Sequence, residues 1–355
     1  MTTRRRRWIP VFALAVVAAA CGGGGGQGAS DDDAIAPVAE APTGPTERPL
    51  QFEGAGKVKL FGALTVPAAS QSAASVPGVL VVPTAAAGGV AGETGVGDAF
   101  GKDLASRFAA AGVATYRYDQ RGTGASKMEP DVRLTLDDLV ADARAALDLL
   151  AQRRETTGRD ISVVGYDQGG LVALRLAAVD DRVKRLVLIS TPGGSLLDVR
   201  AAQIQARYGP EVAEALRSEV VNLVATGTLP PLDALRSELR PLLPAADAGL
   251  LAELYGMDPT AEAARVKAQA MIVVPADPAP YDPQRLATAI PGTQVVSSVG
   301  AGPTLVVSGP TPEDRSDTAN FNHAHGAAPP IPEPKRDTDA LDTMARFVAA
   351  TTGAR

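Results

Sequence analysis

The chain has 355 residues, of which 45% are hydrophobic and 21% are charged, and its net charge at pH 7 is −6. This composition favours a packed globular core over a disordered chain. The negative balance speaks against nucleic-acid binding, which needs a basic surface, so we expect no nucleic-acid partner.

The N-terminus has the pattern of a targeting segment. Arginines occupy residues 4–7, and a short apolar run over residues 9–20 leads to Cys21, the one cysteine of the chain. The run is too short to span a bilayer. Residues 1–21 resemble a bacterial lipoprotein signal peptide, in which Cys21 becomes the lipidated first residue, although Ala18 replaces the usual leucine. An ordinary secretory signal is the alternative.

Two expectations follow from this start. The protein is expected at the bacterial cell envelope, outside the cytoplasm, with membrane contact through a lipid on Cys21 only. A single cysteine leaves no internal disulfide and no cysteine-based metal site. No metal and no cofactor are expected. Residues 22–49 are rich in Gly, Pro and Asp and predict a flexible linker, with the folded domain over residues 50–355.

Within the domain, short apolar runs alternate with stretches of helical periodicity, which is typical of a mostly parallel sheet with helices on both faces. Thr135 with Asp138 predicts the start of one helix, and Gly158 its end. In chain order, we expect strands over 58–66, 79–82, 113–118, 161–164, 185–190, 270–274 and 293–299, and helices over 98–111, 136–154, 169–179, 283–289 and 337–351.

Residues 195–267 interrupt this alternation. They predict helices broken by several prolines, inserted between two strands of the sheet. A helical insertion at that position is where a lid would lie. A small apolar or ester-like ligand would then bind in the pocket beneath it.

Residues 163–170, Val-Val-Gly-Tyr-Asp-Gln-Gly-Gly, predict a strand, a sharp turn and a helix start. The pattern matches the nucleophile elbow G-x-S-x-G, with Asp167 at the serine position. A second motif is the stretch Tyr-Arg-Tyr-Asp-Gln-Arg-Gly-Thr-Gly-Ala-Ser at residues 116–126. It resembles the segment R-Y-D-x-R-G-x-G-x-S that follows a central strand in the same group of proteins. With the strands at 185–190 and 270–274, these motifs occur in an order that resembles the α/β-hydrolase fold superfamily, in particular secreted bacterial esterases and acyl hydrolases.

The resemblance implies a nucleophile, a histidine base, an acid and an oxyanion loop, so each position needs its own inspection. An aspartate is ordinarily ionised at pH 7 and could attack carbon directly, as in the haloalkane dehalogenase and epoxide hydrolase types. Alternatively, the serine is lost and Asp167 is tolerated at the turn.

The position of the family histidine bears on this choice. Pro303 stands there, in Gly300-Ala301-Gly302-Pro303, and proline cannot act as a base. The chain has two histidines, His323 and His325, about twenty residues further on. They are interpreted as surface residues, with a base drawn from one of them as the alternative.

The remaining positions are altered less. The oxyanion loop begins Pro83-Thr84-Ala85, so Thr84, Ala85 and Gln168 are the candidate backbone donors. Asp277 matches the family acid, with Asp282 as a second candidate, although a loop carboxylate that caps a turn is the simpler interpretation.

Three functional hypotheses remain open. The first is a lipid-anchored α/β-hydrolase-fold protein whose catalytic groups have degenerated and which retains a ligand or partner. The second is an active hydrolase, acting on esters or with dehalogenase-like or epoxide hydrolase-like chemistry, that uses Asp167 as nucleophile. The third is a structural envelope protein without a pocket.

Overall fold

The computed structural model describes residues 44–68, 75–84, 98–129, 132–300, 302, 304–308 and 335–350. Several positions singled out in the sequence lie outside these residues, namely the signal segment with Cys21, Ala85, Pro303, His323 and His325.

An eight-stranded sheet forms the centre of the described chain, in the order β1-β2-β4-β3-β5-β6-β7-β8. Strand β2 runs antiparallel to β1 and β4, and the pairs from β4 to β8 are parallel. The strands are β1 (Thr46–Glu53), β2 (Lys59–Val66), β3 (Val76–Val82), β4 (Ala114–Tyr118), β5 (Thr156–Tyr166), β6 (Val183–Ile189), β7 (Gln269–Val274) and β8 (Gln294–Ser297).

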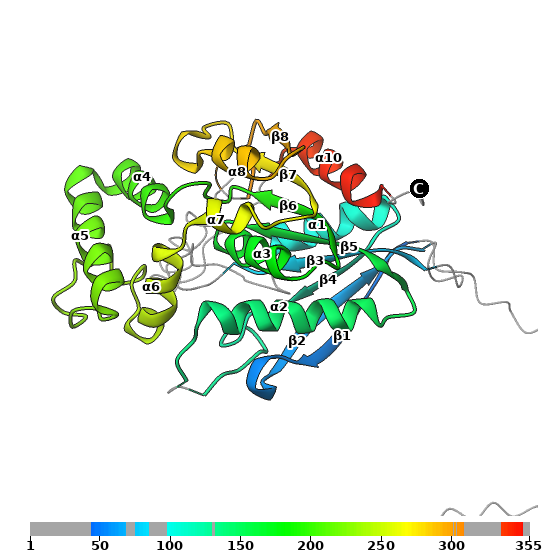
Figure 1. Ribbon diagram of the computed structural model, residues 1–355, viewed down its shortest axis with the longest axis horizontal. Helices are drawn as coiled ribbons and strands as arrows, with labels where there is room; N and C mark the ends of the chain where they lie inside the picture. Colours follow the sequence, from blue (N-terminus) through cyan, green and yellow to red (C-terminus); the bar gives the residue numbers. More distant parts are fainter. Residues whose placement is uncertain are drawn as a thin grey trace, which may run out of the picture. The chain divides into compact units, whose positions relative to one another are not determined.

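Helices cover both faces of the sheet (Figure 1). Helices α1 (Ala99–Ala110) and α10 (Thr338–Ala349) share one buried cluster with one face, while α2 (Leu136–Ala151), α3 (Gln168–Val179) and α8 (Pro283–Ala289) share another cluster with the opposite face. This layering confirms the expected fold class, and it follows from strands whose side chains are apolar on both faces. A small second sheet pairs β9 (Val306–Ser308) with β10 (Lys335–Arg336).

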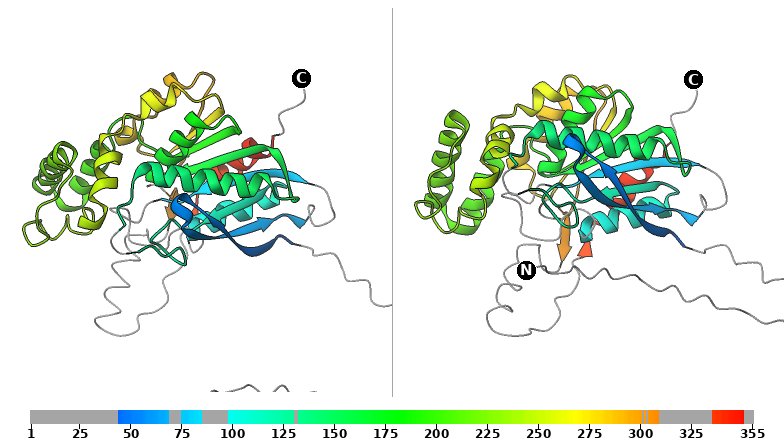
Figure 2. Two further views of the ribbon diagram at one scale, coloured as in Figure 1. Left: turned by 60° about the horizontal axis from the view of Figure 1, so that its bottom comes forward. Right: turned by 90° about the horizontal axis from the view of Figure 1, so that it is seen from below.

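The helical insertion, residues 195–267, lies between β6 and β7. It contains α4 (Leu196–Tyr208), α5 (Pro210–Thr226), α6 (Ala248–Gly256) and α7 (Pro259–Ala263). Figure 2 shows α4, α5 and α6 grouped at one end of the sheet. That is the end at which β5 and β6 finish, so the insertion stands beside the turn that follows β5.

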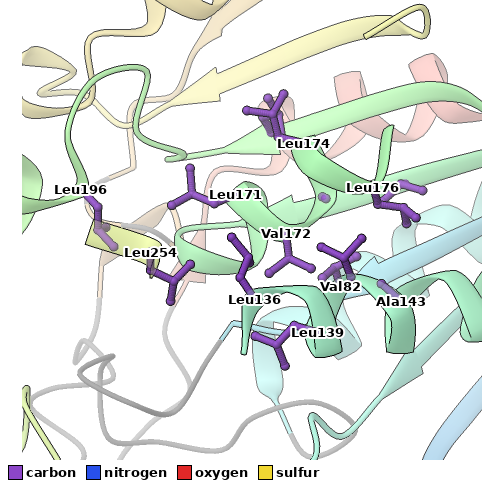
Figure 3. Packing of buried hydrophobic residues seen from close by; sticks show 14 of the residues in the cluster. Val82, Leu136, Leu139, Ala143, Leu171, Val172, Leu174, Leu176, Leu196 and Leu254 are labelled. Carbon is purple, nitrogen blue, oxygen red and sulfur yellow. The ribbon is translucent and has the colours of Figure 1, made fainter. Parts of the chain in front are cut away.

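The core extends without interruption from the sheet into the insertion. Leu196 of α4 and Leu254 of α6 belong to the same buried cluster as Leu171 of α3. Figure 3 shows Val172 of α3 close to Leu136 of α2 in this cluster. Apolar burial therefore holds the insertion against the body of the domain.

A hydrogen bond also joins the insertion to helix α2 of the domain body. The Glu253 carboxylate of α6 accepts from the backbone N–H of Leu136, with N to Oε2 at 2.6 Å. Leu136 is the first residue of α2, and its N–H is one of those that a helix start leaves without a partner inside the helix. The insertion thus supplies a carboxylate to the N-terminus of a sheet-covering helix.

Two boundaries differ from the expectation. Strand β1 begins at Thr46, earlier than the expected start of the domain near Leu50, because residues 46–53 pair fully with β2. Gly158 does not end a helix, since α2 ends at Ala151 and Gly158 lies within β5. Its φ is +67°, and a Cβ there would stand 2.6 Å from the carbonyl oxygen of Ala151, so glycine is required by this close approach. The capping box of Thr135 and Asp138 is present as predicted.

Side chains of the motif at residues 116–126 form buried hydrogen bonds with neighbouring segments of the domain. Arg121 donates from Nε to Asp142 Oδ2 at 2.6 Å and from Nη2 to Asp142 Oδ1 at 2.5 Å, and both side chains are buried. The same Asp142 accepts from the backbone N–H of Ala55 at 2.8 Å. Further along, the Ser126 hydroxyl accepts from the Phe61 N–H of β2. These contacts tie β2, α2 and the segment after β4 together.

This buried pair predicts a measurable stability difference. Asp142→Ala leaves the buried Arg121 guanidinium with only the more distant Asp138 carboxylate, 3.8 Å from Nη1, so the free energy of unfolding should fall by about 3 kcal/mol. Asp148→Ala, on the same helix, removes a half-exposed carboxylate that pairs with Arg182, and should cost less than about 1 kcal/mol. Urea unfolding of both variants measures the difference, and equal losses would contradict this role of Asp142.

Candidate functional site

Asp167 lies on a strained turn between β5 and α3. Its backbone has φ 52° and ψ −124°, a conformation that side-chain-bearing residues rarely adopt and that costs about 1–3 kcal/mol. Two hydrogen bonds hold the turn: the Asp167 N–H donates to the Ile189 carbonyl at 2.9 Å, and the Gly170 N–H donates to the Asp167 carbonyl at 3.1 Å. The geometry is that of the strand-turn-helix elbow that the sequence predicts.

Glycines permit the close approaches around this turn. A Cβ on Gly165 would stand 2.4 Å from the Gly169 carbonyl oxygen, and a Cβ on Gly169 would stand 2.6 Å from the Pro83 carbonyl oxygen. The second contact places the loop after β3, which carries Thr84, directly against the elbow. Gln168, the first residue of α3, is buried beside them. The structure therefore brings Thr84 and Gln168 to the same turn, while Ala85 lies outside the described residues.

The Asp167 carboxylate forms a buried ion pair with Arg200 of α4. Arg200 Nη2 donates to Asp167 Oδ2 at 2.6 Å, and each side chain is 4% exposed. The other carboxylate oxygen, Oδ1, is buried and has no hydrogen-bond partner within the described part of the chain. The elbow thus aims its carboxylate at a cation from the insertion.

Arg200 extends this contact to a second loop. Its Nη1 donates to Gln203 Oε1 at 2.8 Å, and Gln203 Nε2 donates to the Tyr281 hydroxyl at 3.3 Å. Tyr281 belongs to the loop that follows β7. Helix α4 is therefore joined both to the elbow and to the loop in which the sequence places the family acid.

The surroundings of Arg200 favour its charged form. Burial alone lowers the pKa of Arg200, but the nearby Asp167 carboxylate outweighs it, so the pKa stands above its ordinary value. The Tyr255 hydroxyl of α6 is buried beside them. Burial raises the pKa of Tyr255, and the Arg200 charge offsets part of that rise. Arg200 consequently remains a cation within the core, stabilised chiefly by Asp167.

Arg200 was missed in the sequence, although a signal is present. It follows Leu196 by one helical turn and precedes Ile204 by another, so it lies on the apolar face of its helix. An arginine on that face needs a buried anion. The position of that anion, at the turn between β5 and α3, could not be inferred without the tertiary structure.

The candidate acid residues stand elsewhere in the loop after β7. Asp277 is exposed, and its Oδ1 accepts from the backbone N–H of Ala279 at 3.2 Å. Asp282 is also exposed and has φ 44° at the start of α8. Asp277 thus caps a short turn, which agrees with the simpler interpretation of this residue.

The described residues also bear on metals, membranes and pockets. Among them, no cluster of three or more His, Cys, Asp or Glu could hold a metal ion, and no helix has the length and apolarity that crossing a bilayer requires. An open cavity of about 520 Å³ lies between α2, α3, α6 and α7. Its wall includes Asp137, Arg175, Glu253, Asp258 and Glu262 but not Asp167, so it is a polar groove distinct from the elbow.

Comparison with known proteins identifies the class. The model of the family described as serine aminopeptidase, S33, matches residues 94–226, which include the elbow and Arg200. None of the curated protein sequences matches the chain.

Solved structures share the fold. An alpha/beta hydrolase from Penicillium sp. sh18 is 18% identical with a TM-score of 0.51, over 80% of this chain and 100% of that one. A hypothetical protein from Pseudomonas aeruginosa is 16% identical with a TM-score of 0.50, over 80% of this chain and 95% of that one. A thermophilic esterase from Thermogutta terrifontis is 17% identical with a TM-score of 0.48, over 85% and 100% of the two chains. By its fold and the family match, this chain is an α/β-hydrolase-fold protein.

The ion pair at the elbow predicts strong coupling between its two residues. Asp167→Asn and Arg200→Met each leave one charge buried without its partner, so each should lower the free energy of unfolding by about 3–5 kcal/mol. The double variant removes both charges and should lose less than the sum of the single losses.

A matched cycle on the same insertion provides the control. Asp198 and Arg217 form an ion pair in which the side chains are 59% and 40% exposed. Asp198→Asn with Arg217→Met should show coupling below about 1 kcal/mol. Additive losses for Asp167 and Arg200, measured by denaturant unfolding, would show that their contact contributes nothing specific.

Proposed function

We propose that this chain is a lipid-anchored α/β-hydrolase-fold protein that no longer hydrolyses esters and that retains a ligand- or partner-binding role. The observation that carries the proposal is the buried ion pair between Asp167 and Arg200, with Nη2 to Oδ2 at 2.6 Å. It occupies the position from which a nucleophile would attack.

Physical chemistry favours an occupied carboxylate over a nucleophilic one. A nucleophile must present an oxygen to carbon, whereas Oδ2 of Asp167 accepts a charge-assisted hydrogen bond, the strongest class that a side chain makes. Attack by this carboxylate would turn it into a neutral ester and leave Arg200 as an uncompensated buried cation. The reaction would therefore lose an ion pair at the step that needs stabilisation.

The sequence also argues against catalytic turnover. Pro303 stands at the family position of the histidine base, and a carboxylate ester formed on Asp167 needs a base to activate the water that releases it. Loss of a catalytic histidine in a serine protease lowers kcat on the order of a millionfold. A protein with both changes is expected to bind rather than to turn over.

The alternative is an active hydrolase with Asp167 as nucleophile and a base from elsewhere, such as His323 or His325. Two observations favour it: the elbow keeps its strained backbone, and the Oδ1 oxygen of Asp167 has no hydrogen-bond partner among the described residues. In that case Arg200 would hold one oxygen while the other attacks. A structural envelope protein without a ligand is the third possibility.

Hydrolysis of a simple ester separates these functions. We expect the purified protein to release p-nitrophenol from p-nitrophenyl butyrate at the rate of buffer alone, and Asp167→Asn to leave that rate unchanged. The control is Asp198→Asn, which removes an exposed carboxylate from α4. Protein-dependent release that is lost in Asp167→Asn and kept in Asp198→Asn would overturn the proposal in favour of the active hydrolase.

Anchoring is tested separately. The pattern of residues 4–21 predicts that the full chain, produced in a bacterial host, partitions with membranes and into the detergent phase of Triton X-114. Cys21→Ser should move it to the aqueous phase, because the lipid has no attachment site. Equal partitioning of the two proteins would show that Cys21 is not an anchor.

A further inference from the structure

Another buried arginine, Arg185 of β6, pairs across the sheet with a residue five positions before the elbow. It is 2% exposed, yet its Nε and Nη1 atoms have no hydrogen-bond partner within the described residues. Protein interiors almost never retain a cation in this way, because the lost hydration must be replaced by an anion or by hydrogen-bond acceptors. The position therefore lacks a component that the described residues do not supply.

A buried hydroxyl stands next to this guanidinium across the sheet. Ser162 of β5 pairs in register with Arg185, so the two Cα atoms face each other on neighbouring strands, about 4.8 Å apart. Ser162 is fully buried, and its Oγ likewise has no partner among the described residues. Two adjacent strands thus place unsatisfied N–H and O–H groups side by side.

Both side chains point to the same face of the sheet. Val164 and Val187, two residues further along each strand, belong to the buried cluster shared with α1 and α10. Since side chains alternate along a strand, Ser162 and Arg185 face those helices as well. Ser162 and Arg185 lie where the parallel pairing of β5 with β6 begins, whereas Asp167 follows the carboxyl end of β5, five residues after Ser162, so the feature is separate from the elbow.

One carboxylate, that of Asp160, acts on the Arg185 charge. Burial lowers the pKa of Arg185, and the charge of Asp160 offsets part of this, while Nε and Nη1 of Arg185 have no hydrogen-bond partner among the described residues. Asp160 precedes Ser162 by two residues on the same strand, so it stands on the same face. The guanidinium nitrogens Nε and Nη1, which have no partner among the described residues, and the neighbouring hydroxyl match the acceptors and the charge of an oxyanion.

We propose that Arg185 and Ser162 form a binding site for a small oxyanion, such as phosphate or a carboxylate, where the pairing of β5 with β6 begins. Arg185 supplies the charge and two donors, and Ser162 supplies a third donor from the neighbouring strand. The site does not depend on whether Asp167 is catalytic.

A stability crossover tests this site with the full domain. In a phosphate-free chloride buffer, Arg185→Met should melt at or above the wild-type temperature, because it removes a buried charge whose Nε and Nη1 atoms have no hydrogen-bond partner among the described residues. Inorganic phosphate at about ten times its dissociation constant should raise the wild-type Tm by about 2–4 °C and should leave Arg185→Met unchanged. Acetate at equal ionic strength distinguishes a carboxylate site from a phosphate site.

Two further variants sharpen the result. Ser162→Ala should weaken the binding of the same anion about tenfold by isothermal titration calorimetry, since one donor is lost. Lys184→Gln removes an exposed positive charge from the same strand and should bind like wild type. Equal Tm shifts in wild type and Arg185→Met, or no shift with either anion, would overturn the proposal.

Discussion

The negative charge of Asp167 can remain in the interior because the Arg200 guanidinium stands 2.6 Å from its carboxylate. The elbow positions the carboxylate by a strained backbone, and α4 positions the guanidinium by packing its apolar face on the core. Neither charge is acceptable there without the other. The contact therefore fixes where the insertion lies relative to the end of the sheet.

The remaining contacts of the insertion agree with this arrangement. Arg200 reaches Tyr281 through Gln203, and Glu253 caps the first turn of α2, so polar bonds join the insertion to three separate segments of the domain. The apolar cluster is continuous between them. A lid that opens would have to break the Asp167–Arg200 pair, and its role as a lid stays a prediction. In this structure the elbow serves as one half of a contact between the sheet and the insertion.

Much of the fold could be predicted from the sequence, because apolar strands and amphipathic helices are local patterns. The helix start at Thr135 and the turn at Gly165 to Gly169 depend on neighbours a few residues away, and both are present as predicted. Strand β1 was not predicted, and the domain was expected to start near Leu50, because Thr46 to Pro49 are polar or prolyl and only pairing with β2 makes them a strand.

The site was less predictable. Asp167 could be recognised from its motif, but its partner Arg200 lies in a helix that no motif marks. The role of Arg121 was equally hidden, since its partner Asp142 is separated from it by the start of α2. Ion pairs between distant segments leave no periodic signal in the sequence, so the chemistry of a buried carboxylate is decided by the tertiary structure.

The central claim is that the Asp167 carboxylate is a partner of Arg200 and does not attack carbon. Mass spectrometry of the peptide that contains Asp167 tests this directly, after incubation with an aryl glycidyl ether or 1-bromobutane in water enriched in ¹⁸O. An aspartate nucleophile would either retain a covalent ester or, after its hydrolysis, incorporate ¹⁸O into its carboxylate. We expect the peptide mass to stay unchanged with every reagent. An adduct or ¹⁸O on Asp167, absent from the Asp198 peptide, would contradict the account.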